Sequence, residues 1–132
     1  MSEEKERYIY SLLQKFEGTL YLKNKEGLKE IGRVRSERRG FGGKKGRPDF
    51  ILWIELDLDI LKTRLRTEFP ILVEEEDEGI SNVERDYSQF LREEKLFVPM
   101  IVVGGEERKE TLRSFHGLIK VELFQIPFPL AK

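Results

Sequence analysis

Apolar residues near the start of the chain recur at the spacing of one helix face, and the pattern stops before Gly18. The positions on this face are Tyr8, Ile9, Leu12, Leu13 and Phe16. An amphipathic helix buries such a stripe against a core. We therefore predict a helix over residues 3–16, followed by short strands near residues 19–22 and 31–34.

The middle of the chain has two apolar runs typical of strands. Residues 50–58 read FILWIELDL, a run that turns to alternation and therefore predicts a strand whose far end reaches solvent. Residues 61–67 are predicted to be a polar connection. Residues 70–73 are apolar on both faces, which indicates a buried central strand, and Pro70 is expected at its first residue because no ladder donor is lost there.

The remaining third of the chain alternates between expected helices and strands. Ser81 and Glu84 fit a capping box, and the apolar spacing that follows predicts a helix to about Lys95. We expect a buried strand over residues 97–103, a short exposed helix over residues 106–115 and a last strand over residues 118–124. The tail after it is expected to be extended.

This order of elements predicts one mixed α/β sheet flanked by helices. A strand, helix, strand unit over residues 71–103 is expected to be a right-handed parallel crossover. Its first strand would be central in the sheet, with carboxylates at its carboxyl end, where open α/β sheets place their sites.

The composition suits one compact domain spanning residues 1–132. The chain is 39% hydrophobic and has no cysteine, so neither a disulfide nor a thiolate metal site is expected. Charged residues (Glu3, Glu4, Lys5 and Glu6) stand where a signal peptide needs an apolar region, and no apolar run approaches the length of a membrane span, so we expect a cytoplasmic protein with no membrane partner. Charged residues reach 37% but balance to a net charge of -1, a mixture that heat-adapted proteins often show.

Basic residues are concentrated between positions 33 and 47, where four glycines are interspersed. We interpret this stretch as a mobile cationic loop that attracts a phosphate backbone, since glycines permit close approach and the cations supply screened attraction. The alternative is a solvated loop that touches nothing. The candidate nucleic-acid-binding residues are Arg33, Arg35, Arg38, Arg39, Lys44, Lys45 and Arg47.

Acidic residues stand at two places that a strand hairpin would bring together. Asp49 precedes the strand over residues 50–58, and five acids, Glu74 to Glu78, follow the strand over residues 70–73. Converging carboxylates can hold a divalent cation of the Mg²⁺ class, which takes hard oxygen ligands. The apolar run ends at Val73, which favours Glu74 and Glu76; Glu75 with Asp77 is the other register, and a plain solvated strand end is the alternative.

The element order, together with Pro48-Asp49 and an apolar strand ending in Glu-x-Glu, resembles the PD-(D/E)xK nuclease superfamily over residues 3–124. That superfamily includes restriction endonucleases and archaeal Holliday-junction resolvases. The resemblance implies a restriction-endonuclease-like core, αβββαβ with an additional helix and strand. It also implies Mg²⁺ or Mn²⁺ as the cofactor and DNA as the partner.

The resemblance also implies roles for individual residues. Asp49 and Glu74 would be metal ligands, with the backbone carbonyl of Glu75 as a third. Asp49, Glu74 and Glu76 would be the catalytic set. Glu76 stands where the motif has lysine. Some members of the superfamily carry glutamate there, where it would orient or deprotonate the attacking water. Lys44, Lys45 or Arg47 would replace the lysine from just before Asp49.

Three functions follow from these patterns. The first is a metal-dependent DNA endonuclease for repair, restriction or junction processing; the second is the same fold with an impaired site that binds without cutting; the third is an interaction protein with no nucleic-acid role. No nucleotide cofactor is expected, because the glycine loop over residues 40–45 lacks the spacing of a phosphate-binding loop. The apolar stretch over residues 118–130 is either a homodimer contact or a last strand and tail packed on the core.

Overall fold

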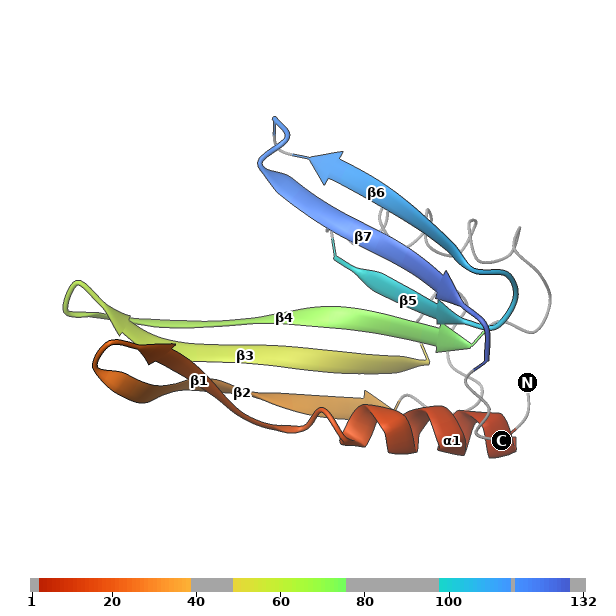
Figure 1. Cartoon of the computed structure of the whole chain (residues 1–132), viewed down its shortest axis with the longest axis horizontal. Helices are drawn as coiled ribbons and strands as arrows, with labels where there is room; N and C mark the ends of the chain where they lie inside the picture. The colour runs from red at the N-terminus through yellow and green to blue at the C-terminus, as the bar shows by residue number, and fades with distance from the viewer. Residues whose placement is uncertain (1–2, 39–48, 76–97, 115, 129–132) are drawn as a thin grey trace.

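The computed structural model describes residues 3–38, 49–75, 98–114 and 116–128 (Figure 1). These residues form one α-helix and a single mixed sheet of seven strands. The elements are α1 (Glu3–Gln14), β1 (Gly18–Asn24), β2 (Gly27–Arg38), β3 (Phe50–Ile60), β4 (Thr63–Glu75), β5 (Met100–Val103), β6 (Arg108–Ser114) and β7 (Ile119–Ile126).

The sheet has the order β1-β2-β3-β4-β5-β7-β6, so β4 is its central strand. Strands β1 to β4 are antiparallel neighbours, whereas β5 runs parallel to both β4 and β7. The expected mixed α/β sheet and the expected parallel pair are therefore confirmed. The helix expected after residue 81 lies outside the described residues, and no described helix is long and apolar enough to cross a membrane.

Helix α1 covers one face of the sheet, as its apolar spacing predicts. Ile9 and Leu13 are buried, and the ring of Tyr10 stacks on that of Phe50 at 6.1 Å. The helix ends at Gln14, two residues before the predicted end, and Phe16 is 65% exposed. The ring of Phe16 therefore contributes little to the core, although its spacing fits the helix stripe.

The two faces of the sheet carry separate apolar clusters. The face under α1, here called the helix face, carries the cluster of Ile9, Leu13, Phe50, Leu52, Val73 and Val103. The opposite face, here called the open face, carries the cluster of Ile51, Leu72, Val98, Met100, Val102 and Leu123. Because successive strand residues point to opposite faces, these clusters fix the direction of every side chain at this end of the sheet.

Strands β3 and β4 form the expected hairpin, but it is longer than the sequence suggested. Residues 61–67, predicted to be a connection, are instead a two-residue turn at Leu61 and Lys62 followed by the first part of β4. Both turn residues have positive φ, 51° and 64°, as a two-residue hairpin loop of type I′ requires. Leu-Lys carries none of the glycine or asparagine signal that usually marks such a turn, which explains the error.

Pro70 lies in the middle of β4, so the prediction that it begins the strand was wrong. The N–H of Leu72, two residues on, points toward β5, where it donates to the Pro99 carbonyl at 3.0 Å. Alternate residues point their N–H groups the same way, so position 70 also faces the β5 side. Strand β5 pairs with β4 only from Leu72 onward, so the proline removes no ladder hydrogen bond.

The helix predicted over residues 106–115 was also wrong, since β6 occupies most of that segment. Strand β6 pairs antiparallel with β7, and Leu112 is the partner of Val121. Leu112 packs against the open-face cluster, so a single apolar residue attaches this strand to the core. The last predicted strand is confirmed as β7, and Phe128 after it packs against the helix-face cluster.

Candidate metal centre at the carboxyl end of β4

Asp49 lies immediately before β3, beside the carboxyl end of β4. The last ladder pair joins Phe50 to Val73, so one further step places Asp49 next to Glu74. The backbone N–H of Glu75 donates to Oδ2 of Asp49 at 3.0 Å. This bond holds the Asp49 carboxylate at the end of the central strand, as the hairpin prediction required.

The sheet pleat separates the adjacent glutamates onto opposite faces. Glu74 points to the open face, because its second neighbour Leu72 belongs to the open-face cluster. Glu75 follows Val73 onto the helix face, where it is buried with 7% of its surface exposed. The pleat of β3, continued one residue before Phe50, would put Asp49 on the open face with Ile51. The register thus selects Glu74, and not Glu75, as the side-chain neighbour of Asp49.

A third polar residue lies in the same row of the sheet. Val102 is the partner of Glu74 on one side and of Gln125 on the other, so all three point to the open face. Gln125 is 2% exposed, and its Nε2 donates to the Gly104 carbonyl at 2.8 Å. Gln125 was not among the predicted site residues, although β7 reads IKVELFQI and places a polar glutamine in the buried register of Val121 and Leu123.

The described residues supply part of the proposed ligand set. Glu76 and the basic residues Arg39, Lys44, Lys45 and Arg47 lie outside them. Within the described ranges no group of three or more histidine, cysteine or acidic side chains could hold a metal ion. What the fold brings together is the pair Asp49 and Glu74, with the Glu75 backbone beside them.

Three of the seven basic candidates lie on β2, so the stretch expected as a loop from Arg33 is a strand as far as Arg38. Arg33 and Arg35 both contact Oε2 of Glu55, with their Nε atoms at 2.9 and 3.2 Å. They share the open face with Asp49, since Arg35 is the partner of Trp53. Arg38 points to the helix face.

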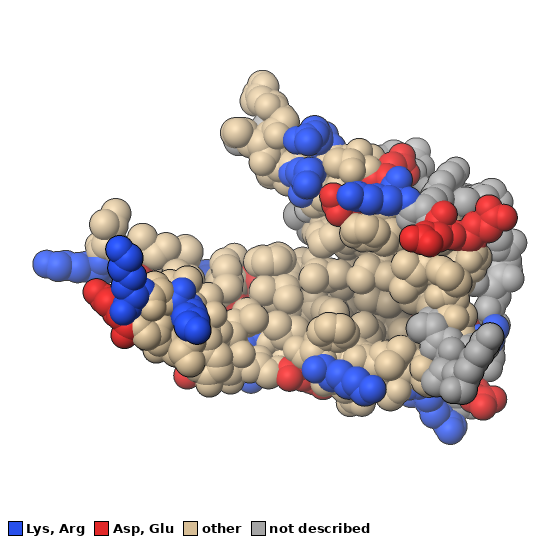
Figure 2. Space-filling model, viewed as in Figure 1, with Lys and Arg blue, Asp and Glu red and all other residues tan. Residues whose placement is uncertain are grey.

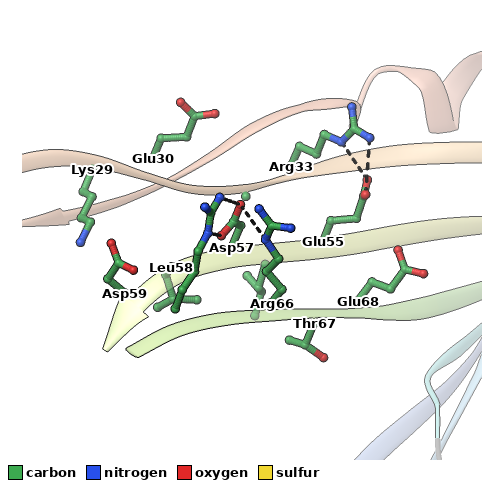
Figure 3. Close-up of a pocket in the computed structure, with 13 residues that line it drawn as sticks. Lys29, Glu30, Arg33, Glu55, Asp57, Leu58, Asp59, Arg66, Thr67 and Glu68 are labelled. Carbon is green, nitrogen blue, oxygen red and sulfur yellow. Dashed lines mark hydrogen bonds and ion pairs between the residues drawn. The ribbon is translucent and has the colours of Figure 1, made fainter. Parts of the chain in front are cut away.

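A charged hollow of about 710 Å³ lies farther along β2, β3 and β4 (Figure 3). Arg64 donates to both carboxylate oxygens of Asp57, from Nε at 2.8 Å and from Nη2 at 2.7 Å, and Arg66 lies 3.7 Å from Oδ2. The hydrogen bonds from Arg64 hold the pKa of the Asp57 carboxyl below its ordinary value of 3.8. Eight residues of strand separate Asp57 from Asp49, about 26 Å, so this hollow is distinct from the candidate centre.

Lys and Arg side chains are unevenly spread over the visible surface. Figure 2 shows them at the turn end of strands β1 to β4, over β6 and β7, and along the lower edge where α1 lies, with a notch between the first two groups. The acidic side chains in this view lie among them. The surface is thus a mixture of both signs, in keeping with the net charge of -1.

Comparison of the chain with protein-family models, with characterised proteins and with solved structures finds no match. The candidate centre is therefore defined by this chain's own geometry: an aspartate before β3, a glutamate at the end of β4 and a buried glutamine on β7, in one row of the open face.

Proposed function

We propose that the protein is a metal-dependent DNA endonuclease whose centre is built on Asp49 and Glu74. One observation supports this proposal: the β3–β4 ladder ends at Phe50 and Val73, and the Glu75 N–H donates to Asp49, so Asp49 and Glu74 are the next residues along at the carboxyl end of the central strand. The nuclease resemblance implies the order αβββαβ. With β1 taken as an additional strand, α1, antiparallel β2, β3 and β4, and parallel β5 agree with that order, and the helix expected between β4 and β5 lies outside the described residues. Asp49 immediately precedes the second of those strands, and Glu74 lies near the end of the third.

The donor set fits a hard divalent cation. Mg²⁺ binds through one or two carboxylates and keeps several waters, so it does not need the larger cage that Ca²⁺ favours. Asp49 and Glu74 would hold it, with the Glu75 carbonyl as a further ligand. The cation would supply charge neutralisation at the phosphodiester and a water of lowered pKa. The protein's own contribution is to fix Asp49, through the Glu75 N–H, beside Glu74.

Arg33 and Arg35 are proposed to contact the DNA backbone on the same face. Arg33 has a 66% exposed side chain, and Arg35 lies over the Trp53 ring at 5.3 Å. Their bonds to Glu55 are half-exposed ion pairs, which contribute little to stability, so a phosphate group can replace the carboxylate at small cost. Binding through such contacts weakens as salt rises.

A second candidate is a protein of the same fold that binds DNA without cutting it. Two observations favour it. Glu76 stands in the position of the motif lysine. The Asp49 carboxylate accepts a backbone hydrogen bond from Glu75, and this bond stabilises the fold without any metal. An aspartate retained for that bond alone would look the same in this structure.

Cleavage assays separate the two candidates. Supercoiled plasmid and branched DNA are incubated with Mg²⁺ or Mn²⁺ and with wild type, Asp49→Asn, Glu74→Gln or the control Asp59→Asn, an exposed acid at the far end of β3. Loss of a ligand should slow cleavage by more than the roughly 10- to 100-fold that outer partners cost. Cleavage that persists in both site variants refutes the centre, whereas salt-sensitive binding without cleavage by wild type supports the second candidate.

A further inference from the structure

Gln125 is buried in the same row of the open face as Glu74, and within the described part of the chain its amide nitrogen is hydrogen-bonded whereas its amide oxygen is not. Only 2% of the residue is exposed, and Nε2 donates to the Gly104 carbonyl. Oε1 is also buried, and it has no hydrogen-bond partner among the described residues. A buried carbonyl oxygen without a partner lowers stability, so its presence on an otherwise apolar strand face calls for a reason.

The known contact of Gln125 explains its nitrogen and leaves its oxygen unexplained. The turn after β5 is attached to β7 twice, by Nε2 of Gln125 and by the bond from the Gly104 N–H to the Ile126 carbonyl at 2.7 Å. Gly105 passes so close that a Cβ there would overlap Nε2, and its φ is 88°. The amide nitrogen therefore positions this turn. Any side chain as long as glutamine that carries an N–H donor would do the same.

The positions of Gln125, Val102 and Glu74 on neighbouring strands relate Oε1 of Gln125 to the proposed cation. Gln125 and Glu74 flank Val102, so two strand spacings, about 10 Å, separate their backbones. Both side chains stand on the open face, and two side chains of this length together span about that separation. The amide oxygen is an acceptor, and a Mg²⁺ ion held by one or two carboxylates carries waters that donate.

We propose that Gln125 is a positioning residue whose Oε1 accepts a hydrogen bond from a water on the divalent cation held by Asp49 and Glu74. This inference rests on the proposed function. It assigns the buried amide two tasks: the nitrogen fixes the turn after β5, and the oxygen orients a cation-bound water from the β7 side.

Two substitutions separate these tasks. Gln125→Met removes both the donor and the acceptor, whereas Gln125→Glu keeps an acceptor oxygen and removes the donor to Gly104. Binding of Mn²⁺ alone is measured by calorimetry, and thermal unfolding is followed with and without Mn²⁺. We expect Gln125→Met to weaken Mn²⁺ binding by about 10- to 100-fold, the usual effect of losing an outer partner. Gln125→Glu should bind Mn²⁺ at least as tightly as wild type while unfolding at a lower temperature.

Val121→Ala is the matched control, because Val121 is buried on the same strand and has no polar group. It should lower the unfolding temperature and leave Mn²⁺ affinity unchanged. Equal Mn²⁺ affinity in wild type and Gln125→Met overturns the role of Oε1, as does a Gln125→Glu variant as weak as Gln125→Met. If wild type binds no Mn²⁺, or if Asp49→Asn leaves Mn²⁺ affinity unchanged, the proposed function itself is overturned. The two failures are therefore distinguishable.

Discussion

Nε of Arg38, the last residue of β2, lies 3.2 Å from Oε1 of Glu6, a residue of α1 whose side chain is fully buried. Glu6 stands one turn before Ile9 and Tyr10 on the face of the helix that packs on the sheet. Arg38 is also the strand partner of Phe50, the residue after Asp49. The pair thus attaches α1 to the part of the sheet that presents the candidate centre.

Breaking this pair from one side should be costly. Arg38→Met leaves a buried carboxylate without its cation, and we expect a loss of about 3–5 kcal/mol in the free energy of unfolding. The double variant Glu6→Leu with Arg38→Met should recover most of that loss, because no isolated charge is left buried. Urea unfolding followed by the fluorescence of Trp53, the single tryptophan, measures both. A double variant less stable than Arg38→Met would contradict the interpretation.

Asp49 should contribute to stability whether or not it binds a cation. Asp49→Ala removes the acceptor for the Glu75 N–H, and a hydrogen bond to a charged group contributes about 1.5–3 kcal/mol. Asp49→Asn keeps an oxygen acceptor and should lose less. Amide exchange at Glu75 without metal should accelerate in the alanine variant and remain slow in the asparagine variant. Equal protection of that amide in wild type and Asp49→Ala would show that the bond is unimportant.

Periodicity predicted the helix and the buried strands because both signals are local. The stripe through Ile9 and Leu13 and the apolar run around Leu72 are each readable within about ten residues. The placement of Asp49 beside the end of β4 also followed from a hairpin and two apolar runs. What the pattern left open was the register, and a single step along β4 exchanges Glu74 for Glu75 on the open face.

The wrong predictions concern segments whose structure depends on contacts with distant parts of the chain. Strand β6 carries one apolar anchor, Leu112, so its strand state depends on pairing with β7 and leaves little trace in its own sequence. The Leu61-Lys62 turn has no conventional turn residue, yet eleven ladder pairs between β3 and β4 enforce it. Gln125 stands in the buried register of its own strand, but its relation to Glu74 runs through Val102 on β5 and cannot be read from the sequence of β7 alone.

Close approach of strands at Gly32 should make that glycine irreplaceable. A Cβ at Gly32 would overlap the Glu55 carbonyl oxygen on the neighbouring strand, which is backbone and cannot turn aside. Gly18 has nearly the same φ, +155° against +154°, but open space around it, so it controls for backbone strain. Gly32→Ala should cost about 1–3 kcal/mol more than Gly18→Ala in urea unfolding, the usual range for overpacking. Equal losses would show that φ alone matters.

Asp57 should make stability depend on pH in the acidic range. Its carboxyl pKa is lowered chiefly by the hydrogen bonds from Arg64; desolvation opposes this shift, and the charges of Arg64 and Arg66 lower the pKa further. A depressed carboxyl pKa stabilises the folded state above the unfolded value of about 3.9, and this contribution is lost as the pH falls through the folded pKa. Asp57→Asn should therefore remove part of the decline in stability below about pH 4.

The pair is exposed, so the effect should be small and sensitive to salt. Urea midpoints recorded between pH 6 and pH 2, about the range in which acidic groups titrate, should fall less steeply for Asp57→Asn than for wild type. Added 1 M NaCl should bring the two curves together, because the Debye length is then about 3 Å. Glu122 lies on β7, and its pKa is lowered by Lys109 and then by Lys120. It should therefore make a separate contribution to the fall in stability with falling pH, of the same sign as that of Asp57. Parallel curves for wild type and Asp57→Asn at low salt would mean that the Arg64 pair does not survive in solution.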